Sequence, residues 1–505
     1  MKPQQAISPT REENFAGWYQ RVIQVAGLAE NSEVRGCMVI KPWGYALWEN
    51  IQAALDCMLK ATGHRNVYFP LFIPLSHLQR EAGHVEGFAK ECAVVTHCRL
   101  EAHDGGKLIP TAPLKEPLVV RPTSETIIGS TFARWIHSHR DLPILLNQWA
   151  NVVRWEMRPR LFLRTTEFLW QEGHTAHATE AEATEETESM LRLYENFTRD
   201  YLALPVVRGE KTASERFPGA VRTFCIEAMV QDRRAIQAGT SHFFGQNFSR
   251  ASGIRFQSRS GGLEYAWTTS WGVSTRLIGT LIMAHSDDDG LVLPPRVAPT
   301  QVVVVPILFK GEMRAQVLAR AELVATQLRR GCFCDQPIRV ELDNRDLGNG
   351  IKKWEWIKRG VPIRLELGSR DLKTGSVTLF RRDLSPEERY LLPADRAADE
   401  VPRLLANIQA NLLTRATNFC GAHTHRINSE REFYQFFTPR NARKSEIHGG
   451  FALAHWSDSS NIEEKLKVDL KVSIRCIPSD TLKEPGQCIF TGKPSAQRAL
   501  FARSY

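Results

Sequence analysis

Apolar residues near the start of the chain recur at helical spacing. Between Lys41 and Thr62 they fall on one face of a helix, at Trp43, Leu47, Ile51, Leu55 and Met58. Gly63 follows and favours the end of the helix there, because glycine adopts the left-handed cap conformation without steric cost. The segment Val67–Pro70 is β-branched and aromatic and predicts a strand, whose proline places it at a sheet edge or bulge.

A different pattern begins near residue 290. Asp287–Gly290, followed by two prolines, predicts a turn and linker. Beyond it the sequence predicts a helix at Met313–Arg330 and strands at Gln301–Phe309, Ile338–Leu342, Ile363–Leu367 and Ser376–Arg381. This alternation indicates a small mixed sheet with helices packed on it. From about residue 425 the chain is more polar, so we expect three domains, at residues 1–290, 291–415 and 416–505.

The composition is that of an ordinary globular protein. Of the 505 residues, 43% are hydrophobic and 24% are charged, so a packed core is easy to build. The formal net charge of +9 suits a polyanionic partner, although a solvated basic surface explains it equally well. We find neither a signal-peptide pattern nor an apolar run long enough to cross a membrane. The ten cysteines form no disulfide framework, so we expect a reduced, cytoplasmic location.

The two commonest nucleotide-binding loops are missing from the sequence. It contains neither G-x-x-x-x-G-K-[ST] nor G-x-G-x-x-G. If the protein binds ATP, side chains must therefore hold the phosphates. Arginine suits that role because its planar guanidinium makes bidentate contacts with phosphate oxygens.

Three polar stretches carry the candidate chemistry: Arg121–Thr126, residues 153–174 and Ser270–Arg276. The middle stretch predicts a hairpin, with strands at Leu145–Val153 and Leu161–Trp170. By the two-residue period, Arg154 and Glu156 share one face, and so do Arg164, Thr166 and Phe168. Together they offer phosphate clamps, an acceptor for a metal or amine, and a base-stacking surface. For any one of these residues alone, a surface ion-pair ladder beside a core phenylalanine is the better interpretation.

The combination resembles the signature of the class II aminoacyl-tRNA synthetases. Lys41–Pro70 matches motif 1, a long helix and a strand that ends in proline. Arg154, Glu156, Arg164 and Phe168 match motif 2, R-x-E and R-x-x-x-F, and Gly272–Arg276 matches motif 3, a glycine-containing helix that ends in arginine. The wording RPTSET, FLWQEGHTAH and SWGVSTR is similar to the prolyl-tRNA synthetases in their eukaryotic and archaeal-like form, over nearly the whole chain.

The resemblance implies an α+β fold. An antiparallel-sheet catalytic domain would be followed by an α/β anticodon-binding domain and a small α/β C-terminal domain. The implied activity is ATP-dependent formation of prolyl-adenylate, with Mg²⁺ accompanying ATP, and transfer of proline to tRNA(Pro). Positioning and neutralisation of phosphate charge would carry catalysis. A homodimer across motif 1 is usual in the class.

The resemblance also implies the roles of individual residues. Thr123, Glu125 and Arg154 would hold proline, with Glu125 pairing the secondary ammonium and Arg154 the carboxylate or the α-phosphate. The proline pocket would be completed by Trp170, Glu172, His174, Phe217, His242 and Ser270. Such an apolar pocket rejects a smaller side chain by only about 1–3 kcal/mol per methylene, so we expect some activation of alanine or cysteine.

For ATP, Phe168 would stack under adenine, with Arg276 over its other face. Glu156 would lie near the adenine or a metal-bound phosphate. The triphosphate would be contacted by Arg164, Thr165, Gln237 and Thr240. The catalytic residues are accordingly expected to be Arg154, Glu156 and Arg276. In the second domain, the candidates for reading anticodon guanines are Lys352, Glu355 and Arg370, each of which could equally be a solvated charge at a sheet edge.

The sequence departs from the family at the C-terminal zinc site. The four cysteine positions align with Ser457, Ile462, Cys488 and Thr491, so one thiolate remains, and tetrahedral structural zinc needs four nitrogen or sulfur ligands. We expect no zinc there, and a domain held by apolar residues such as Phe451, Leu453, Trp456 and Ile489. The irregular set Cys92, His97, Cys98 and His103 is also not expected to bind metal, nor are His174 and His177.

Ser270 follows His174 by only 96 positions, which leaves no room for the large editing insertion of bacterial-type prolyl enzymes. Two alternatives compete with the enzyme hypothesis. One is a synthetase-like protein that binds tRNA or a regulator without catalysis, and the lost zinc ligands give it some support. The other is a related class II enzyme for another small amino acid, such as threonine. The threonine enzyme would need a zinc ion in its pocket and a Cys/His set that is not apparent here.

Overall fold

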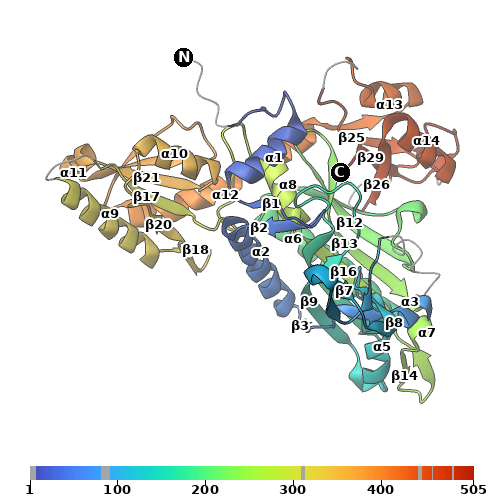
Figure 1. Ribbon diagram of the computed structural model, residues 1–505. Helices are drawn as coiled ribbons and strands as arrows, with labels where there is room; N and C mark the ends of the chain where they lie inside the picture. The colour runs from blue at the N-terminus through green and yellow to red at the C-terminus, as the bar shows by residue number, and fades with distance from the viewer. Residues whose placement is uncertain (1–6, 81–90, 309–312, 442–445, 458, 480–482) are drawn as a thin grey trace.

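The largest sheet of the described residues has eleven strands, which come from both the N-terminal and the C-terminal parts of the chain (Figure 1). The structure is a computed structural model that describes residues 7–80, 91–308, 313–441, 446–457, 459–479 and 483–505. The antiparallel centre of this sheet consists, in spatial order, of β11 (Val206–Glu210), β12 (Arg222–Met229), β13 (Ala235–Gly245), β16 (Trp267–Ser274), β10 (Glu167–His177) and β9 (Ile144–Val153). The two-residue β3 (Arg65–Asn66) pairs with β9 in parallel at the edge.

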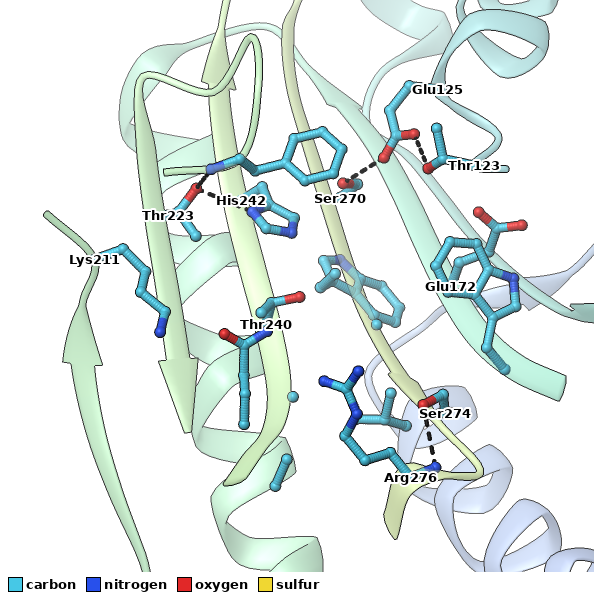
Figure 2. Close-up of a pocket in the computed structure, with 18 of the residues that line it drawn as sticks. Thr123, Glu125, Glu172, Lys211, Thr223, Thr240, His242, Ser270, Ser274 and Arg276 are labelled. Atoms are coloured by element: carbon cyan, nitrogen blue, oxygen red, sulfur yellow. Dashed lines mark hydrogen bonds between the residues drawn. The ribbon is translucent and has the colours of Figure 1, made fainter. Parts of the chain in front are cut away.

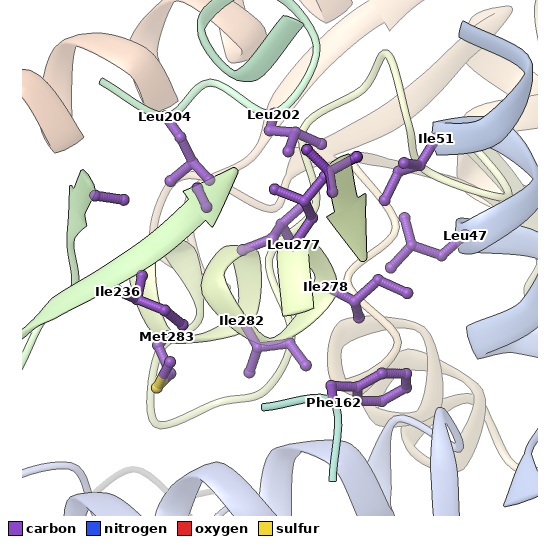
Figure 3. Close-up of a cluster of buried hydrophobic side chains, with 14 of the residues drawn as sticks. Leu47, Ile51, Phe162, Leu202, Leu204, Ile236, Leu277, Ile278, Ile282 and Met283 are labelled. Carbon is purple, nitrogen blue, oxygen red and sulfur yellow. The ribbon is translucent and has the colours of Figure 1, made fainter. Parts of the chain in front are cut away.

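Four helices cover the hydrophobic side of this sheet region: α1 (Phe15–Val25), α2 (Pro42–Ala61), α6 (Glu180–Asp200) and α8 (Arg276–His285). The predicted helix at Lys41–Thr62 is confirmed as α2, with Pro42 in its first turn, where a missing N–H costs no hydrogen bond. Its buried face packs into one large core with the apolar side of α8 (Figure 3). The core includes Leu47, Ile51, Phe162, Leu277, Ile278 and Ile282.

Two predictions in this region, one of a strand and one of a helix, are wrong. Val67–Pro70 is not a strand, because the N–H of Phe69 donates to the side-chain oxygen of Gln148 rather than to a backbone ladder. The expected motif 3 helix at Gly272–Arg276 is the end of strand β16, and helix α8 begins at Arg276. This segment pairs with β10 on one side and β13 on the other, and its alternating residues Trp271 and Val273 are buried in the main core. Pairing and packing therefore favour the extended form.

The hairpin of residues 145–170 differs from its prediction on the return side. Strand β9 matches the outgoing prediction, but β10 starts only at Glu167. Residues 155–166 form a loop in which Arg160 and Arg164 make an isolated bridge. The two-residue period therefore does not apply to Arg164 and Thr166, which precede β10. It does not apply to Arg154 and Glu156 either, because both follow the end of β9, so the predicted shared strand faces are wrong. Pro159 and the turn after it interrupt the ladder.

The second domain is a five-stranded mixed sheet, in the order β20-β17-β21-β22-β23. Its strands are β17 (Val302–Pro306), β20 (Val340–Leu342), β21 (Ile363–Leu367), β22 (Ser376–Arg381) and β23 (Tyr390–Pro393). Its helices are α9 (Met313–Arg330), α10 (Asn349–Lys358), α11 (Ser369–Thr374) and α12 (Ala397–Ala422). The predicted helix and the last two predicted strands are confirmed residue for residue. Strand β17 is shorter than expected, because it ends at Pro306, and Phe309 lies outside the described residues.

The C-terminal strands are part of the same eleven-stranded sheet rather than forming a sheet of their own. Beyond β11 the order is β26 (Val472–Pro478), β29 (Arg498–Arg503), β25 (Phe451–His455) and β24 (Thr424–Ile427), with helices α13 (Glu430–Phe437) and α14 (Ser460–Leu470) packed against them (Figure 1). At the junction, Gly209 pairs with Pro478. A Cβ at Gly209 would lie 2.5 Å from the carbonyl oxygen of Ile477, so glycine permits this close approach.

The apolar residues expected to hold the C-terminal region are buried to different degrees. Phe451 and Trp456 are buried, and Leu453 and Ile489 are partly buried in the clusters around β25. Among the described residues, no helix combines the length and apolar character needed to cross a membrane.

Candidate functional site

A cavity of about 350 Å³ lies along strands β10, β16 and β13 (Figure 2). It brings together residues predicted from five separate stretches of sequence. They are Thr123, Glu125, Arg154, Phe168, Trp170, Glu172, His174, Phe217, Gln237, Thr240, His242, Ser270 and Arg276. A second cavity of about 190 Å³ shares Arg154, Phe168 and Arg276 with the first, and its lining adds Glu156, Arg164 and Thr165. The two cavities therefore form one cleft that contains every residue predicted to bind proline or ATP.

Strand pairing explains why these residues meet. On β10, Trp170, Glu172 and His174 alternate onto one face. Their direct partners on β16 are Ser274, Gly272 and Ser270, and His242 of β13 is opposite Ser270 from the other side. Neighbouring positions on three adjacent strands thus line the same cavity.

Glu125 is a buried carboxylate at one end of the cavity. It occupies the first turn of α5 (Glu125–Trp135), where the helix N-terminus stabilises negative charge. The hydroxyl of Thr123 donates to one of its oxygens, and the hydroxyl of Ser270 donates to the other at 3.1 Å. Figure 2 shows this group at the opposite end of the cavity from Arg276. A carboxylate held in this way is a suitable acceptor for a ligand ammonium group.

Glu172 is committed to contacts within the protein. Its Oε1 accepts from the hydroxyl of Ser124 at 2.6 Å and from the amide of Gln148 at 2.7 Å, and its Oε2 lies 2.9 Å from Nε2 of His174. Burial alone would raise the pKa of Glu172, but these hydrogen bonds and the charge of His174 lower it. Burial likewise opposes the charged form of His174, yet Glu172 raises the pKa of His174 above its ordinary value. The Glu172–His174 pair thus forms a hydrogen-bonded part of the cavity wall.

His242 forms an uncharged part of the cavity wall. Burial, with the nearby positive charges of His174 and Arg154, lowers its pKa from 6.5 to about 3. Its Nδ1 lies 3.1 Å from the hydroxyl of Thr223, and the ring of Phe217 lies 4.5 Å away, centroid to centroid. A neutral imidazole and a phenyl ring together make a surface suited to an apolar ring.

Arg154 lies at the centre of the cleft. Its Nε donates to the carbonyl of Pro122 at 2.9 Å, and its guanidinium carbon lies 5.6 Å from the ring centroids of both Phe168 and Trp170. Burial lowers its pKa, while the charges of Glu125, Glu91 and Glu172 act in the opposite direction. The guanidinium is thus fixed between two aromatic rings, within reach of both cavities.

Positive charge accumulates at the other end of the cleft. The Nε of Arg276 donates to the carbonyl of Leu163 at 3.1 Å. Burial, together with the positive charges of Arg164 and Arg154, lowers the pKa of Arg276 to about 10. Arg164 is half-exposed and lies 3.8 Å from the carboxylate of Glu156. An anionic ligand in the cleft would offset the repulsion between these guanidinium groups.

The predicted anticodon residues lie apart from the cleft, in the second domain. Lys352 is only 1% exposed, and its Nζ donates to the backbone carbonyl of Asp343 at 3.0 Å. It therefore holds the loop after β20 and presents no amine to a nucleotide, which corrects its prediction as a base reader. Glu355 is partly exposed and lies 3.0 Å from both Arg345 and Arg359. Arg370 is exposed in the first turn of α11.

The residues at the aligned zinc positions do not fit the metal. The hydroxyls of Ser457 and Thr491 lie 2.9 Å apart and hydrogen-bond each other. Burial opposes the thiolate of Cys488, but hydrogen bonds from Thr491 and Ser457 lower its pKa. One thiol and two hydroxyls cannot supply a tetrahedral nitrogen and sulfur set. Within the described ranges, no group of three or more His, Cys, Asp or Glu side chains is arranged to hold a metal ion, including the set around Cys92.

Several functional contacts were missed at the level of sequence. Gln148 and Thr223 support Glu172 and His242, and Lys211 lines the cavity from the end of β11. The signal for Gln148 was a polar residue inside an apolar strand, directly opposite Glu172 in the sheet. Lys211 offered no comparable signal, because its partners Glu227 and Arg475 are distant in sequence.

Comparison with known families agrees with this geometry along the chain. Residues 109–285 match the tRNA synthetase class II core domain (G, H, P, S and T), residues 301–404 match an anticodon binding domain, and residues 443–505 match the C-terminal domain of prolyl-tRNA synthetase. A Proline--tRNA ligase 2 from Anaeromyxobacter dehalogenans is 60% identical over 504 residues, which cover 99% of this chain and 98% of the relative. This chain belongs to the prolyl-tRNA synthetases.

Other relatives extend the comparison to solved structures. The Proline--tRNA ligase of Protochlamydia amoebophila is 57% identical over all of this chain and 99% of its own length. The crystal structure of the prolyl-tRNA synthetase from Cryptosporidium parvum, complexed with L-proline and AMP, superposes with a TM-score of 0.88 at 36% identity, over 99% of this chain and 97% of that one. The predicted class II fold with anticodon-binding and C-terminal domains is confirmed, and the threonine alternative is wrong.

The segment between β10 and β16 belongs to the catalytic unit. Residues 178–266, all of which the structure describes, form α6, β11, β12, β13 and short elements that pack on them. They build the cavity wall, so this part of the chain contains no separate domain of the kind that an editing insertion would form.

The neutral state of His242 gives a testable pH dependence. Its pKa of about 3 in the folded chain, against 6.5 in the unfolded chain, means that the unfolded state binds the extra proton between these values. The stability contributed by the neutral ring is therefore present above about pH 6.5 and is lost as the pH falls toward 3. Histidine NMR should show this ring, assigned by comparison with His242→Asn, uncharged from pH 8 to pH 5. A ring that gains a proton between pH 7 and pH 5 would contradict the assignment.

Proposed function

We propose that this chain, a proline–tRNA ligase by family, carries out both steps of its reaction in the cleft between β10, β16 and β13. The supporting observation is the separation of charge within one cavity. The carboxylate of Glu125 lies at one end and the guanidinium of Arg276 at the other (Figure 2), while Arg154 lines both cavities and Arg164 lines the second one. An amino acid with a positive amine and a nucleotide with negative phosphates fit this arrangement in only one direction.

Proline would bind with its ring against Phe217 and His242. Its secondary ammonium would donate to Glu125, which the hydroxyls of Thr123 and Ser270 hold in place. Its carboxylate would lie toward Arg154. Trp170 and the Glu172–His174 pair would complete the pocket from β10. Alanine and cysteine could enter the same pocket with weaker contacts, so their slower activation remains a prediction.

ATP would bind across the shared wall of the two cavities. Its adenine would lie between Phe168 and Arg276, and its phosphates would be held by Arg154, Arg164 and Thr165, with Gln237 and Thr240 on the β13 side. Glu156, with one oxygen accepting from the N–H of Arg158, faces the second cavity and suits an oxygen ligand of ATP-bound Mg²⁺.

In the first step an oxygen of the proline carboxylate attacks the α-phosphorus, and the bond to pyrophosphate breaks. Arg154 would stabilise the charge that develops on the α-phosphate oxygens. In the second step a hydroxyl of the terminal ribose of tRNA(Pro) attacks the prolyl carbonyl, and AMP leaves. No protein nucleophile is needed, because positioning and charge neutralisation supply the rate.

Amino-acid-dependent ATP–pyrophosphate exchange tests this assignment. Exchange should be strongest with proline, weaker with alanine and cysteine, and absent with threonine. Arg154→Ala should reduce kcat/KM by roughly a hundredfold or more, because it removes a guanidinium from the developing phosphate charge. Arg140→Ala, at an exposed arginine outside the cavity, is the matched control and should leave exchange unchanged. A folded chain that binds tRNA without exchanging any amino acid would favour the non-catalytic alternative.

For the tRNA, we propose that Arg370 and Glu355 contact anticodon bases, and that Lys352 supports the loop beside them from inside. Arg370→Ala should raise KM for tRNA in aminoacylation by roughly tenfold and leave ATP–pyrophosphate exchange unchanged, because a base contact is worth about 1–3 kcal/mol. Lys373→Ala, which removes a positive charge from the same helix, is the control. Equal effects of the two substitutions would indicate general electrostatic attraction instead of base recognition.

We also infer a homodimer that works in the cytoplasm. Exposed apolar side chains beside the motif 1 segment, Tyr68 and Phe72, support a covered surface there, and all ten cysteines are free thiols, as in a reducing compartment. Sedimentation of the purified chain should give the mass of a dimer, and a monomer at micromolar concentration would contradict this inference.

A further inference from the structure

One wall of the proline cavity is a loop with little regular structure. The connection from β11 to β12 contains a single 3₁₀ turn, Ala213–Glu215, and otherwise irregular backbone. Glu215, Arg216, Phe217 and Pro218 of this loop line the cavity. Because the loop must hold its shape for Phe217 to contact a substrate ring, something must fix its position.

Helix α14 of the C-terminal domain contacts this loop directly. Glu463, in the first turn of α14, is 4% exposed and accepts hydrogen bonds from two loop hydroxyls through the same oxygen, Oε2. The donors are Thr212, at 3.3 Å, and Ser214. One turn further along, Lys467 forms an ion pair with Glu215 of the loop. Burial of a carboxylate costs free energy unless hydrogen-bond donors compensate for the lost water, and the loop supplies these donors.

Strand β26 anchors the start of the same loop. The Nζ of Lys211 donates to Glu227 at 2.9 Å and to the backbone carbonyl of Arg475 at 2.7 Å. The guanidinium of Arg475 in turn lies 3.0 Å from Glu227, which is completely buried. The loop is therefore tied to the C-terminal domain along its first five residues.

The far end of the loop is joined to the ring pocket itself. The N–H of Phe217 donates to the hydroxyl of Thr223 at 3.1 Å, and the same hydroxyl contacts Nδ1 of His242. Movement of the loop would therefore displace Phe217 and disturb the support of His242 together. The contacts form a continuous path from α14 to the two rings that face the substrate.

We propose that α14 positions the proline-binding wall and that Glu463 is a positioning residue for recognition of the amino acid. This inference rests on the proposed binding of proline in the cavity. By holding the β11–β12 loop in its bound shape, Glu463 removes an ordering cost that proline would otherwise have to offset. The C-terminal domain, which lacks the residues for a zinc site, thus contributes to substrate affinity through a buried carboxylate.

Steady-state ATP–pyrophosphate exchange separates this role from a structural one. Glu463→Ala should raise KM for proline by about tenfold, with kcat and KM for ATP changed less than about twofold, because the lost contact affects ground state and transition state alike. Glu463→Gln should retain a nearly normal KM, since an amide oxygen accepts from both hydroxyls. Glu464→Ala, at an exposed position of the same helix, is the matched control.

A substitution on the loop side provides an independent test. Ser214→Ala should also raise KM for proline, and combining it with Glu463→Ala should add little, because both changes remove the same contact. An unchanged KM for proline in Ser214→Ala and Glu463→Ala would overturn the inference. The inference would also be overturned if Glu463→Ala and Glu463→Gln lost thermal stability and kcat to the same extent. If the unsubstituted chain shows no proline-dependent exchange, the proposed function itself is wrong. If the unsubstituted chain exchanges normally and the KM for proline of both variants is unchanged, only the role of Glu463 is wrong.

Discussion

The pairing register of β10 determines which side chains face the cavity. Glu172 is directly opposite Gln148 on one side and Gly272 on the other, and His174 is opposite Ser270. Because side chains alternate along a strand, a slip of one residue would turn the whole set toward the helices. Gly173 helps to fix this register, since a Cβ there would lie 2.1 Å from the ring of Trp271 in the neighbouring strand.

The site built on this register separates two kinds of charge. Near α5, the carboxylate of Glu125 is held by two hydroxyl groups and suits a cationic ligand group. Near α8, burial and mutual repulsion lower the pKa of Arg276, so this end gains most from an anion. Between the two ends, aromatic and neutral imidazole rings exclude water from the position that an apolar ring would occupy. A dipolar amino acid and a nucleotide can meet there with their reacting groups adjacent.

Local pattern and motif spacing predicted much of this arrangement, but long-range contacts escaped both. The helix at Met313–Arg330 followed from its periodicity, and the cavity residues followed from motifs whose roles are shared by related enzymes. Arg164 was assigned to a strand face because the alternation of residues after Pro159 does not show that the return strand starts only at Glu167. Lys352 was predicted to read an anticodon base, although its amine is buried against a carbonyl nine residues away. The support of the pocket by Glu463 depends on residues about 250 positions apart, which no local signal could reveal.

A crystal structure of this chain with a non-hydrolysable prolyl-adenylate analogue tests the central claim most directly. The proline ring should lie between Phe217, His242 and Trp170, with its ammonium group against Glu125. The phosphate mimic should contact Arg154, and the adenine should lie between Phe168 and Arg276. An analogue bound in the reverse direction, with its adenine against Phe217 and His242, would contradict the charge separation from which the function is argued. Binding outside this cleft would contradict the site as a whole.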